Sequence, residues 1–219
     1  MIILLDASAK KVQAARDKYG DIFGQLLVPG TCNSLTARRL ASPITPLGLD
    51  NGCYAGTLDR RAWIAGIKAV AGDPGLKFVA MPDTWGDARR TLELFTIARE
   101  WVPAGVPLAL VAQDGLADLS IPWDEIKAVF LGGSDDWRAS HAAVCVLKAA
   151  RILGKWVHVG RVNTPAAIRR WRPLADSCDG SGVSRYDDML HQAARALTDA
   201  GDDTPDLFES EKNLTGPLD

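Results

Sequence analysis

Polar residues follow several short apolar runs of this chain, at the points where strands are expected to end. Asp50, Asp83 and Gln113 each come shortly after such a run, and Asp179 lies among small residues near the C-terminus. In a parallel α/β barrel, catalytic residues come from the C-terminal ends of several strands. The spacing therefore predicts one active site assembled from distant segments.

These residue types suit acid–base and covalent chemistry on a purine. Carboxylates such as Asp50 and Asp179 can attack an electrophilic carbon or carry a proton. The Gln113 amide can both donate and accept a hydrogen bond, as a base edge requires. The Gly132-Gly133 pair precedes a predicted helix, and bare N–H groups at such a position favour a carbonyl or anionic oxygen.

Simpler structural interpretations stand beside these functional ones. Asp50 precedes Asn51-Gly52, which is by itself a strong turn signal. Asp83 could cap the helix that follows it, although Thr84 and Asp87 could cap that helix as well. The glycine pair also fits a tight turn between a strand and a helix.

Two aspartates compete for the pocket near the C-terminus. Alternation along a strand puts positions 176 and 178 on one face and positions 177 and 179 on the other, so Asp176 and Asp179 point in different directions. His158 alternates with valines in its own expected strand, where a histidine is more often a core residue than a catalyst. We nevertheless retain it as a candidate substrate-binding residue.

The elements that must position these residues recur along the chain. Apolar runs predict strands near residues 2–5, 26–29, 46–49, 77–81, 107–112, 127–131, 156–160 and 175–178. Helical spacing predicts helices over residues 9–18, 59–71, 87–101, 134–153 and 184–200. Alternating strands and helices imply a parallel sheet with helical crossovers.

Eight such strands predict a small (β/α)8 barrel, because 219 residues lie near the lower end, about 200, of the range for this fold. An open, doubly wound sheet is the alternative, but no G-x-G-x-x-G motif follows the first strand. We expect one catalytic domain over residues 1–200 and a polar, loosely ordered tail over residues 201–219.

Composition restricts the partners of the protein. The net charge of −2 provides no overall attraction to nucleic acid, so any such contact needs a local basic face. Arginine pairs could form a phosphate-binding track if several of them lie near one rim; they occur at 38–39, 60–61, 89–90 and within 169–172.

Cysteine spacing and hydropathy indicate the expected environment. The four cysteines form no C-x-x-C pair, so we expect no zinc site and reduced thiols in a cytoplasm. No apolar run reaches about 18 residues, which predicts no membrane span. The N-terminal apolar segment meets Asp6 too early for a signal peptide.

Taken in order, the motifs match those of one enzyme family. They lie at Asp50-Asn51-Gly52-Cys53-Tyr54, Asp83, Val111 to Gly115, Leu131-Gly132-Gly133, Val159 to Pro165 and Asp176 to Arg185. In that order they resemble the D-S-G-G-F/Y motif, a strand-end aspartate, V-Q-G-G, I-G-G, G-V-G-T-P and D-x-F-D-C-x-x-P-T-R of the tRNA-guanine transglycosylases and their phage relatives that place 7-deazaguanines in DNA.

The chain also departs from that family. It is much shorter than the tRNA enzymes and lacks their C-terminal cysteine–histidine zinc site; Cys53 replaces a glycine, and Asp114 interrupts the glycine pair after Gln113. The resemblance is therefore best to the compact relatives that act on DNA.

The resemblance implies that the protein exchanges guanine for a 7-deazaguanine through a covalent intermediate. In that interpretation Asp179 attacks the sugar C1′ and Asp50 shuttles the proton. The implied substrate-binding residues include Asn51 from the first motif, Tyr54 for stacking, Asp83 for the N1 and 2-amino edge, and Gln113 with the Gly132-Gly133 backbone for O6.

The implied partners are DNA, or less favourably tRNA, and a free 7-deazaguanine base, in a bacterial or phage-infected cytoplasm and without a cofactor or metal. Two rival functions stay open: another barrel glycosidase or lyase, and a barrel that only binds a purine or nucleic acid. A lyase of the aldolase type would need a lysine at a strand's C-terminal end, whereas Lys77 and Lys155 lie at N-terminal ends.

Overall fold

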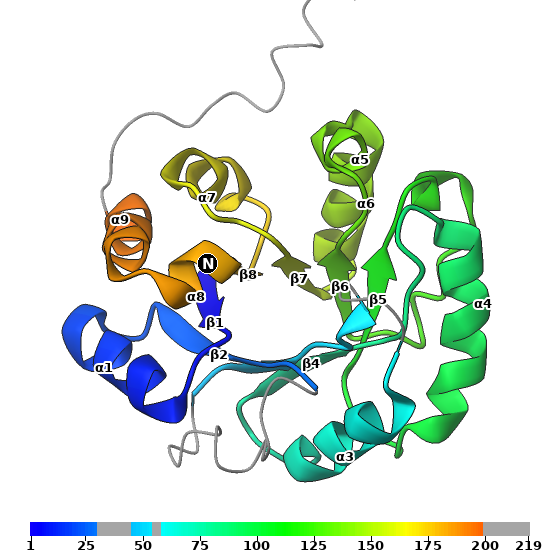
Figure 1. The fold of residues 1–219 in the computed structure, drawn as a ribbon. Helices are drawn as coiled ribbons and strands as arrows, with labels where there is room; N and C mark the ends of the chain where they lie inside the picture. Colours follow the sequence, from blue (N-terminus) through cyan, green and yellow to red (C-terminus); the bar gives the residue numbers. More distant parts are fainter. Residues whose placement is uncertain (30–44, 54–57, 199–219) are drawn as a thin grey trace, which may run out of the picture.

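A closed barrel of eight parallel strands, surrounded by helices, forms the described part of the chain (Figure 1). The computed structural model describes residues 1–29, 45–53 and 58–198. Each strand pairs with the next along the chain, and β1 pairs with β8 to close the barrel. The strands are β1 (Ile2–Leu5), β2 (Phe23–Leu27), β3 (Leu47–Leu49), β4 (Leu76–Ala80), β5 (Leu108–Ala112), β6 (Ala128–Leu131), β7 (Trp156–Val159) and β8 (Ser177–Asp179). The predicted (β/α)8 fold is confirmed.

The helices follow the strands and pack on the outside of the barrel (Figure 1). They are α1 (Ala9–Tyr19), α3 (Arg60–Val70), α4 (Ala88–Ala98), α5 (Asp135–Ala139), α6 (His141–Ile152), α7 (Pro165–Trp171), α8 (Ser181–Arg185) and α9 (Asp187–Thr198), with 3-10 turns η2 (Arg99–Trp101) and η3 (Leu116–Asp118). The predicted tail over 201–219 lies outside the described residues.

Two sequence-based helix predictions are wrong, and one helix was not predicted. The helix predicted over 134–153 is two helices, because the Ser140 hydroxyl accepts a hydrogen bond from the Ala143 N–H and starts α6. The helix predicted from residue 184 begins at Ser181 as α8 and restarts as α9. The short helix α7, which was not predicted, begins at a Thr164 cap and Pro165.

The second strand lies earlier than predicted, at Phe23–Leu27 rather than 26–29. Its first half contains glycine and glutamine, which hide it from a search for apolar runs. Pairing of Ile3 with Phe23 in the closed sheet fixes its register, so tertiary contacts decide this boundary.

A small apolar cluster fills the inside of the barrel. It contains Leu4, Leu26, Phe78, Ala109 and Ala128, with Phe130 and Trp156 packed against it. Gly48 of β3 makes room for the Phe78 ring, because a Cβ at that position would lie 2.5 Å from a ring carbon. Large and small residues therefore alternate across the interior, which is a packed floor rather than a channel.

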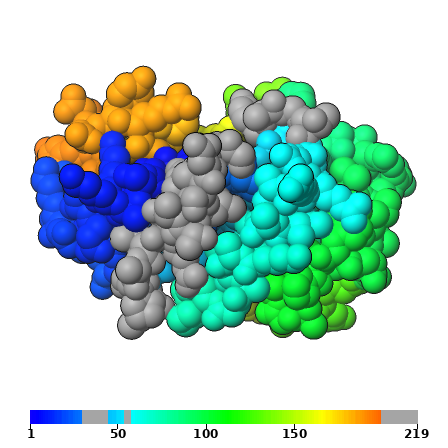
Figure 2. Space-filling view, turned by 60° about the horizontal axis from the view of Figure 1, so that its bottom comes forward, coloured from blue at the N-terminus to red at the C-terminus, as the bar shows by residue number. Residues whose placement is uncertain are grey.

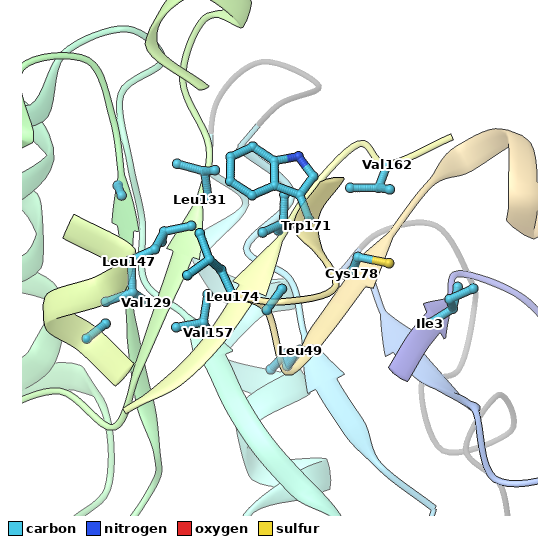
Figure 3. Packing of buried hydrophobic residues seen from close by; sticks show 14 of the residues in the cluster. Ile3, Leu49, Val129, Leu131, Leu147, Val157, Val162, Trp171, Leu174 and Cys178 are labelled. Carbon is cyan, nitrogen blue, oxygen red and sulfur yellow. The ribbon is translucent and has the colours of Figure 1, made fainter. Parts of the chain in front are cut away.

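A second, larger core lies between the strands and the helices. Figure 3 shows part of it, where Val129, Val157 and Cys178 of neighbouring strands meet Leu147 of α6 and Trp171 of α7. In Figure 2 the first and last described segments, blue and orange, lie side by side, as the pairing of β1 with β8 requires. No helix among the described residues is long and apolar enough to span a membrane.

Candidate active site at the carboxyl ends of the strands

One pocket of about 360 Å³ lies at the carboxyl ends of strands β3 to β8. This volume falls in the range of small-molecule sites, roughly 300–1,000 Å³. The predicted residues that line it are Asp50, Asn51, Asp83, Gln113, Gly132, Gly133 and Asp179. His158 does not line it, and Tyr54 lies outside the described residues. The topology thus brings together almost all of the residues predicted from strand-end positions.

Asp179 occupies the end of β8 and borders the pocket, with 19% of its side chain exposed. Its Oδ1 lies 3.0 Å from Nε2 of His158, and its Oδ2 has no hydrogen-bond partner among the described residues. Asp176 lies at the opposite end of β8, where it accepts a hydrogen bond from the Val157 N–H at 2.8 Å. Asp179, and not Asp176, is therefore the carboxylate available for chemistry.

A chain of hydrogen bonds inside the barrel fixes the orientation of Asp179. The Trp156 indole N–H, which can only donate, lies 2.8 Å from Ser177 Oγ. Ser177 Oγ lies 2.8 Å from His158 Nδ1, and Nε2 of the same ring lies 3.0 Å from Asp179 Oδ1. When the Ser177 hydroxyl donates to Nδ1, the ring proton of a neutral His158 lies on Nε2 and is donated to Asp179.

His158 is thus a positioning residue, which corrects its prediction as a substrate-binding residue. Its side chain is fully buried, and both ring nitrogens have partners within the barrel. Its ring packs against Phe78 and Phe130, with centroids 4.7 Å and 4.5 Å away. His158 is buried, as the simpler interpretation of a core histidine predicts. Its contact with Asp179 could not be inferred from the sequence.

Asp50 follows β3 and accepts a hydrogen bond from the Gly52 N–H at 2.7 Å, so the predicted turn and the predicted site residue coexist. Burial raises the pKa of Asp50 to about 7; the Gly52 bond opposes this rise, and the charges of Asp179 and Asp83 add to it. A carboxyl group with a pKa near neutrality can both give and take a proton at pH 7.

Asp83 is held between two side-chain amides at the carboxyl end of β4. Its Oδ1 accepts a hydrogen bond from Asn51 Nδ2 at 2.7 Å, and its Oδ2 accepts one from Gln113 Nε2. Burial raises the pKa of Asp83, while these two hydrogen bonds and one with Cys53 oppose the rise. Asp87, and not Asp83, caps α4, so the simple capping interpretation of Asp83 is wrong.

Asn51 positions Asp83 rather than offering its own amide to a ligand. Its Nδ2 donates to the Met81 carbonyl and to Asp83, each at 2.7 Å, and its Oδ1 accepts from the Cys53 N–H at 2.7 Å. Both amide hydrogens are therefore used within the protein. Asn51 lines the pocket, and only the second lone pair of its Oδ1 is left for a ligand, so its role as a substrate contact stays a prediction.

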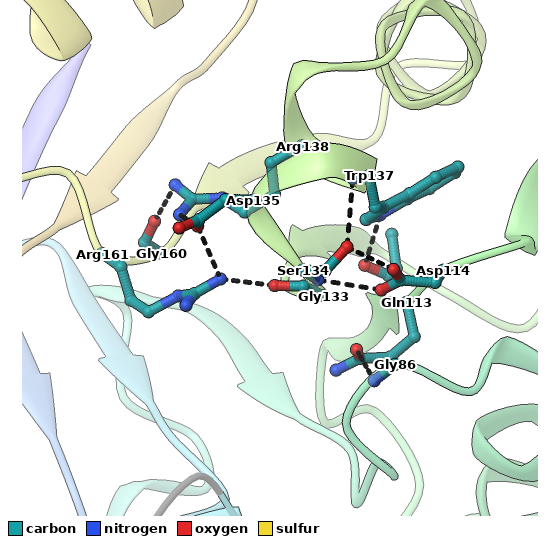
Figure 4. Close-up of polar contacts among 11 residues, drawn as sticks. Gly86, Gln113, Asp114, Gly133, Ser134, Asp135, Trp137, Arg138, Gly160 and Arg161 are labelled. Atoms are coloured by element: carbon teal, nitrogen blue, oxygen red, sulfur yellow. Dashed lines mark hydrogen bonds and ion pairs between the residues drawn. The ribbon is translucent and has the colours of Figure 1, made fainter.

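Gln113 keeps hydrogen-bonding capacity for a ligand. Its Oε1 accepts from the Gly86 N–H at 2.9 Å (Figure 4), and its Nε2 donates to Asp83. An amide has a second N–H and a second oxygen lone pair. Gln113 can therefore serve a base edge while its orientation is fixed by Asp83 and Gly86.

The backbone N–H groups of Gly132 and Gly133 differ in whether they already have a hydrogen-bond acceptor. The Gly132 N–H donates to the Ala112 carbonyl at 3.1 Å, so the prediction that it binds a ligand oxygen is corrected. The Gly133 N–H has no acceptor among the described residues. Gly133 has φ +78°, and a Cβ there would lie 2.4 Å from the Trp137 ring and 2.5 Å from Asp114. Only glycine fits this position.

Asp114 holds this loop in place. Its carboxylate accepts hydrogen bonds from the Ser134 N–H, at 2.9 Å, and from the Ser134 hydroxyl (Figure 4). Ser134 in turn caps α5 by accepting from the Trp137 N–H. Asp114 therefore stabilises the wall of the pocket without lining it.

Two pocket residues were missed by sequence reasoning. Trp85 lines the pocket and is 61% exposed, an unusual position for a tryptophan. Arg161 follows β7 with a left-handed φ of 58°, a strained conformation for a residue with a Cβ. Their place in loops directly after strands was the available signal. No group of three or more metal-ligating side chains occurs in the described ranges.

The fold and this site together define a (β/α)8 barrel with a pocket lined by carboxylates at the carboxyl ends of its strands. The chain matches no protein-family model and no curated protein sequence. Its structure is similar to that of a mutant tryptophan synthase alpha-subunit from the hyperthermophile Pyrococcus furiosus, with a TM-score of 0.55 and 17% identity over 90% of this chain and 96% of that chain.

A citrate lyase from Burkholderia xenovorans LB400 is also similar in structure. Its TM-score is 0.51, with 12% identity over 90% of this chain and 76% of that chain. At these identities the likeness concerns the barrel fold alone.

Proposed function

We propose that this protein is an enzyme that exchanges guanine for a 7-deazaguanine in a nucleic acid strand, with DNA favoured over tRNA. One observation carries the proposal: a single pocket contains Asp179, whose Oδ2 accepts no hydrogen bond from the described residues, and Asp50, whose pKa of about 7 allows it to hold a proton at neutral pH. A nucleophilic carboxylate and a proton-carrying carboxylate are the two groups that retaining cleavage of a glycosidic bond requires.

The reaction would proceed in two displacements at C1′. Asp179 Oδ2 attacks C1′ while the bond to the purine N9 breaks; the electron pair leaves with the base, and the proton on Asp50 is transferred to that base. The incoming base then gives a proton to the Asp50 carboxylate and attacks C1′, which breaks the ester and returns the electron pair to Asp179. Two inversions retain the configuration of the sugar.

The remaining pocket residues support recognition of a guanine-type base. Asp83 already accepts two hydrogen bonds from amides, but an ionised carboxylate offers about four lone-pair positions, so it can also accept from the N1–H and 2-amino groups. Gln113 Nε2 and the Gly133 N–H can donate to O6. The exposed indole of Trp85 at the same pocket provides a stacking surface for the ring.

A barrel lyase, or a different glycosidase, is the second candidate. The same acid–base pair could cleave other bonds, and the structural likeness to a tryptophan synthase alpha-subunit and a citrate lyase belongs with this alternative. No lysine lines the pocket among the described residues, so this candidate would rely on Asp50 and Asp179 instead of an imine. A barrel that only binds a purine or nucleic acid is a third outcome of the test below.

The test is to trap the covalent intermediate. We incubate the protein with a guanine-containing single-stranded oligodeoxynucleotide, denature it, and measure intact mass and released guanine. We expect a protein adduct whose added mass equals the oligonucleotide minus guanine, and we expect Asp179→Asn to abolish it because an amide cannot attack C1′.

Asp136→Asn is the matched control, since Asp136 is an exposed carboxylate of α5 that does not line the pocket. This variant should form the adduct normally. Guanine release without any adduct, or an adduct that persists in Asp179→Asn, would contradict the proposed mechanism. Binding of the oligonucleotide with no release of guanine would favour the non-catalytic alternative.

A further inference from the structure

A shallow groove of about 630 Å³ adjoins the pocket along α5 and α7. Its charged lining residues are Arg138, Arg161, Arg170 and Asp135. Arg161 lines both this groove and the pocket. The two cavities thus adjoin at Arg161.

Three guanidinium groups in this groove each donate a hydrogen bond to a backbone carbonyl. Arg138 Nη2 donates to the Gly160 carbonyl at 2.5 Å, and Arg161 Nη2 donates to the Gly133 carbonyl (Figure 4). Arg170 Nη2 donates to the Ala139 carbonyl at 3.4 Å. The lining carries three guanidinium groups and one carboxylate, so positive charge is in excess there. Burial and the neighbouring Arg161 both lower the pKa of Arg138.

Asp135 marks the position at which an anion would bind. Its Oδ1 lies 3.7 Å from Arg138 Nη1 and 3.7 Å from Arg161 Nη2 (Figure 4). These separations exceed those of charged hydrogen bonds, roughly 2.7–2.9 Å, and the Asp135 side chain is 88% exposed. One anionic oxygen thus lies loosely between two oriented guanidiniums and is free to move away.

We propose that this groove binds a phosphodiester of the nucleic acid strand next to the target nucleotide, and that the phosphate displaces the Asp135 carboxylate. The proposal rests on the proposed function for the identity of the strand. Arg161 at the pocket edge and Arg170 on α7 extend the positive charge along the groove. The target nucleoside carries a phosphate on its 5′ side and another on its 3′ side. The strand must therefore run out of the pocket across its rim, where at least one of these phosphates would lie. Arginine is suited to such contacts because its planar fork binds two phosphate oxygens.

The test is fluorescence anisotropy of a labelled single-stranded oligodeoxynucleotide at several salt concentrations. It uses Asp179→Asn protein, so that no turnover occurs. We expect Arg161→Gln and Arg170→Gln each to weaken binding about three- to tenfold and to reduce the salt slope by about 0.7 per lost contact. Asp135→Asn should tighten binding, because it removes the competing anion. Arg169→Gln, an exposed arginine of α7 outside the groove, is the matched control and should bind normally.

Unchanged binding in Arg161→Gln and Arg170→Gln, or weaker binding in Asp135→Asn, would overturn the proposal. Guanosine 5′-monophosphate and inorganic phosphate are the competing probes. If only these small phosphates depend on the arginines, the groove is a site for a free phosphate group and the assignment to a strand is wrong. Arginine-dependent strand binding without guanine release in the parental protein would leave the groove in place and reject the base-exchange function instead.

Discussion

The raised pKa of Asp50 predicts how the free energy of unfolding changes with pH. Because burial raises its pKa from 3.8 to about 7, the folded protein binds a proton more tightly than the unfolded chain does. Asp50 therefore lowers the free energy of unfolding as pH rises from about 4 to about 7, and the full cost remains above pH 7. Asp50→Asn keeps an oxygen that can accept from Gly52 but removes the titration.

The magnitude follows from the size of the shift. A pKa change of about 3 units corresponds to about 4 kcal/mol at a pH where the group is ionised in both states. Most of the change falls between about pH 5 and about pH 8, where the wild-type protein should lose about 2–3 kcal/mol relative to Asp50→Asn.

Urea unfolding gives the free energy of unfolding of the wild-type protein and of Asp50→Asn at each pH. The effect is the change with pH in the difference between these two free energies. Asp136→Asn is the control for the loss of a carboxylate, since Asp136 lies on the surface. If the stability difference between wild type and Asp50→Asn stays constant from about pH 5 to about pH 8, Asp50 is not held protonated in the folded state. Its assignment as the proton carrier would then fail.

Three further predictions concern residues around the pocket. His158→Phe keeps a ring in the aromatic layer but removes the hydrogen bond to Asp179, so kcat should fall about a hundredfold while KM for the free base stays unchanged; a fall in affinity without a change in kcat would contradict a positioning role. Gly48→Ala should destabilise the barrel by about 1–3 kcal/mol in urea unfolding, since its Cβ would meet the Phe78 ring at 2.5 Å, and a neutral effect would refute the close packing. Trp85→Ala should leave stability within about 0.5 kcal/mol, because the indole is 61% exposed, but should weaken calorimetric binding of guanine by about 1–3 kcal/mol; unchanged binding would exclude stacking on Trp85.

The barrel could be predicted from the sequence because its signals are local. Most strands contain a short apolar run, and most helices carry an apolar stripe. The exceptions have physical reasons. Gly24 and Gln25 obscure β2, whose register depends on pairing with β1, and α7 is too short to show a periodic pattern. Ser140 ends one helix and caps the next within what looks like a single helical stretch.

The site could be predicted as a set of positions but not as a set of roles. Polar residues at the ends of predicted strands led to the prediction that Asp50, Asp83, Gln113 and Asp179 share one pocket, and all four line it. The sequence could not distinguish a residue that meets a ligand from one that holds its neighbour, because that depends on which hydrogen bonds are already satisfied. Asn51 illustrates the difference, since both hydrogens of its amide are used by the protein.

The buried hydrogen-bond chain has a consequence for how this barrel can be misread. Ser177, His158 and Asp179 are the same three side-chain types as a serine hydrolase triad, but the ring nitrogens are exchanged, with Nδ1 at the serine and Nε2 at the aspartate. Here the exposed end is reversed: Ser177 is fully buried and Asp179 borders the pocket. A template search based on these side chains alone would assign a serine nucleophile, and reagents that label active-site serines would have no access to it. The direction in which a triad faces solvent, rather than its composition, decides which of its members can attack a substrate.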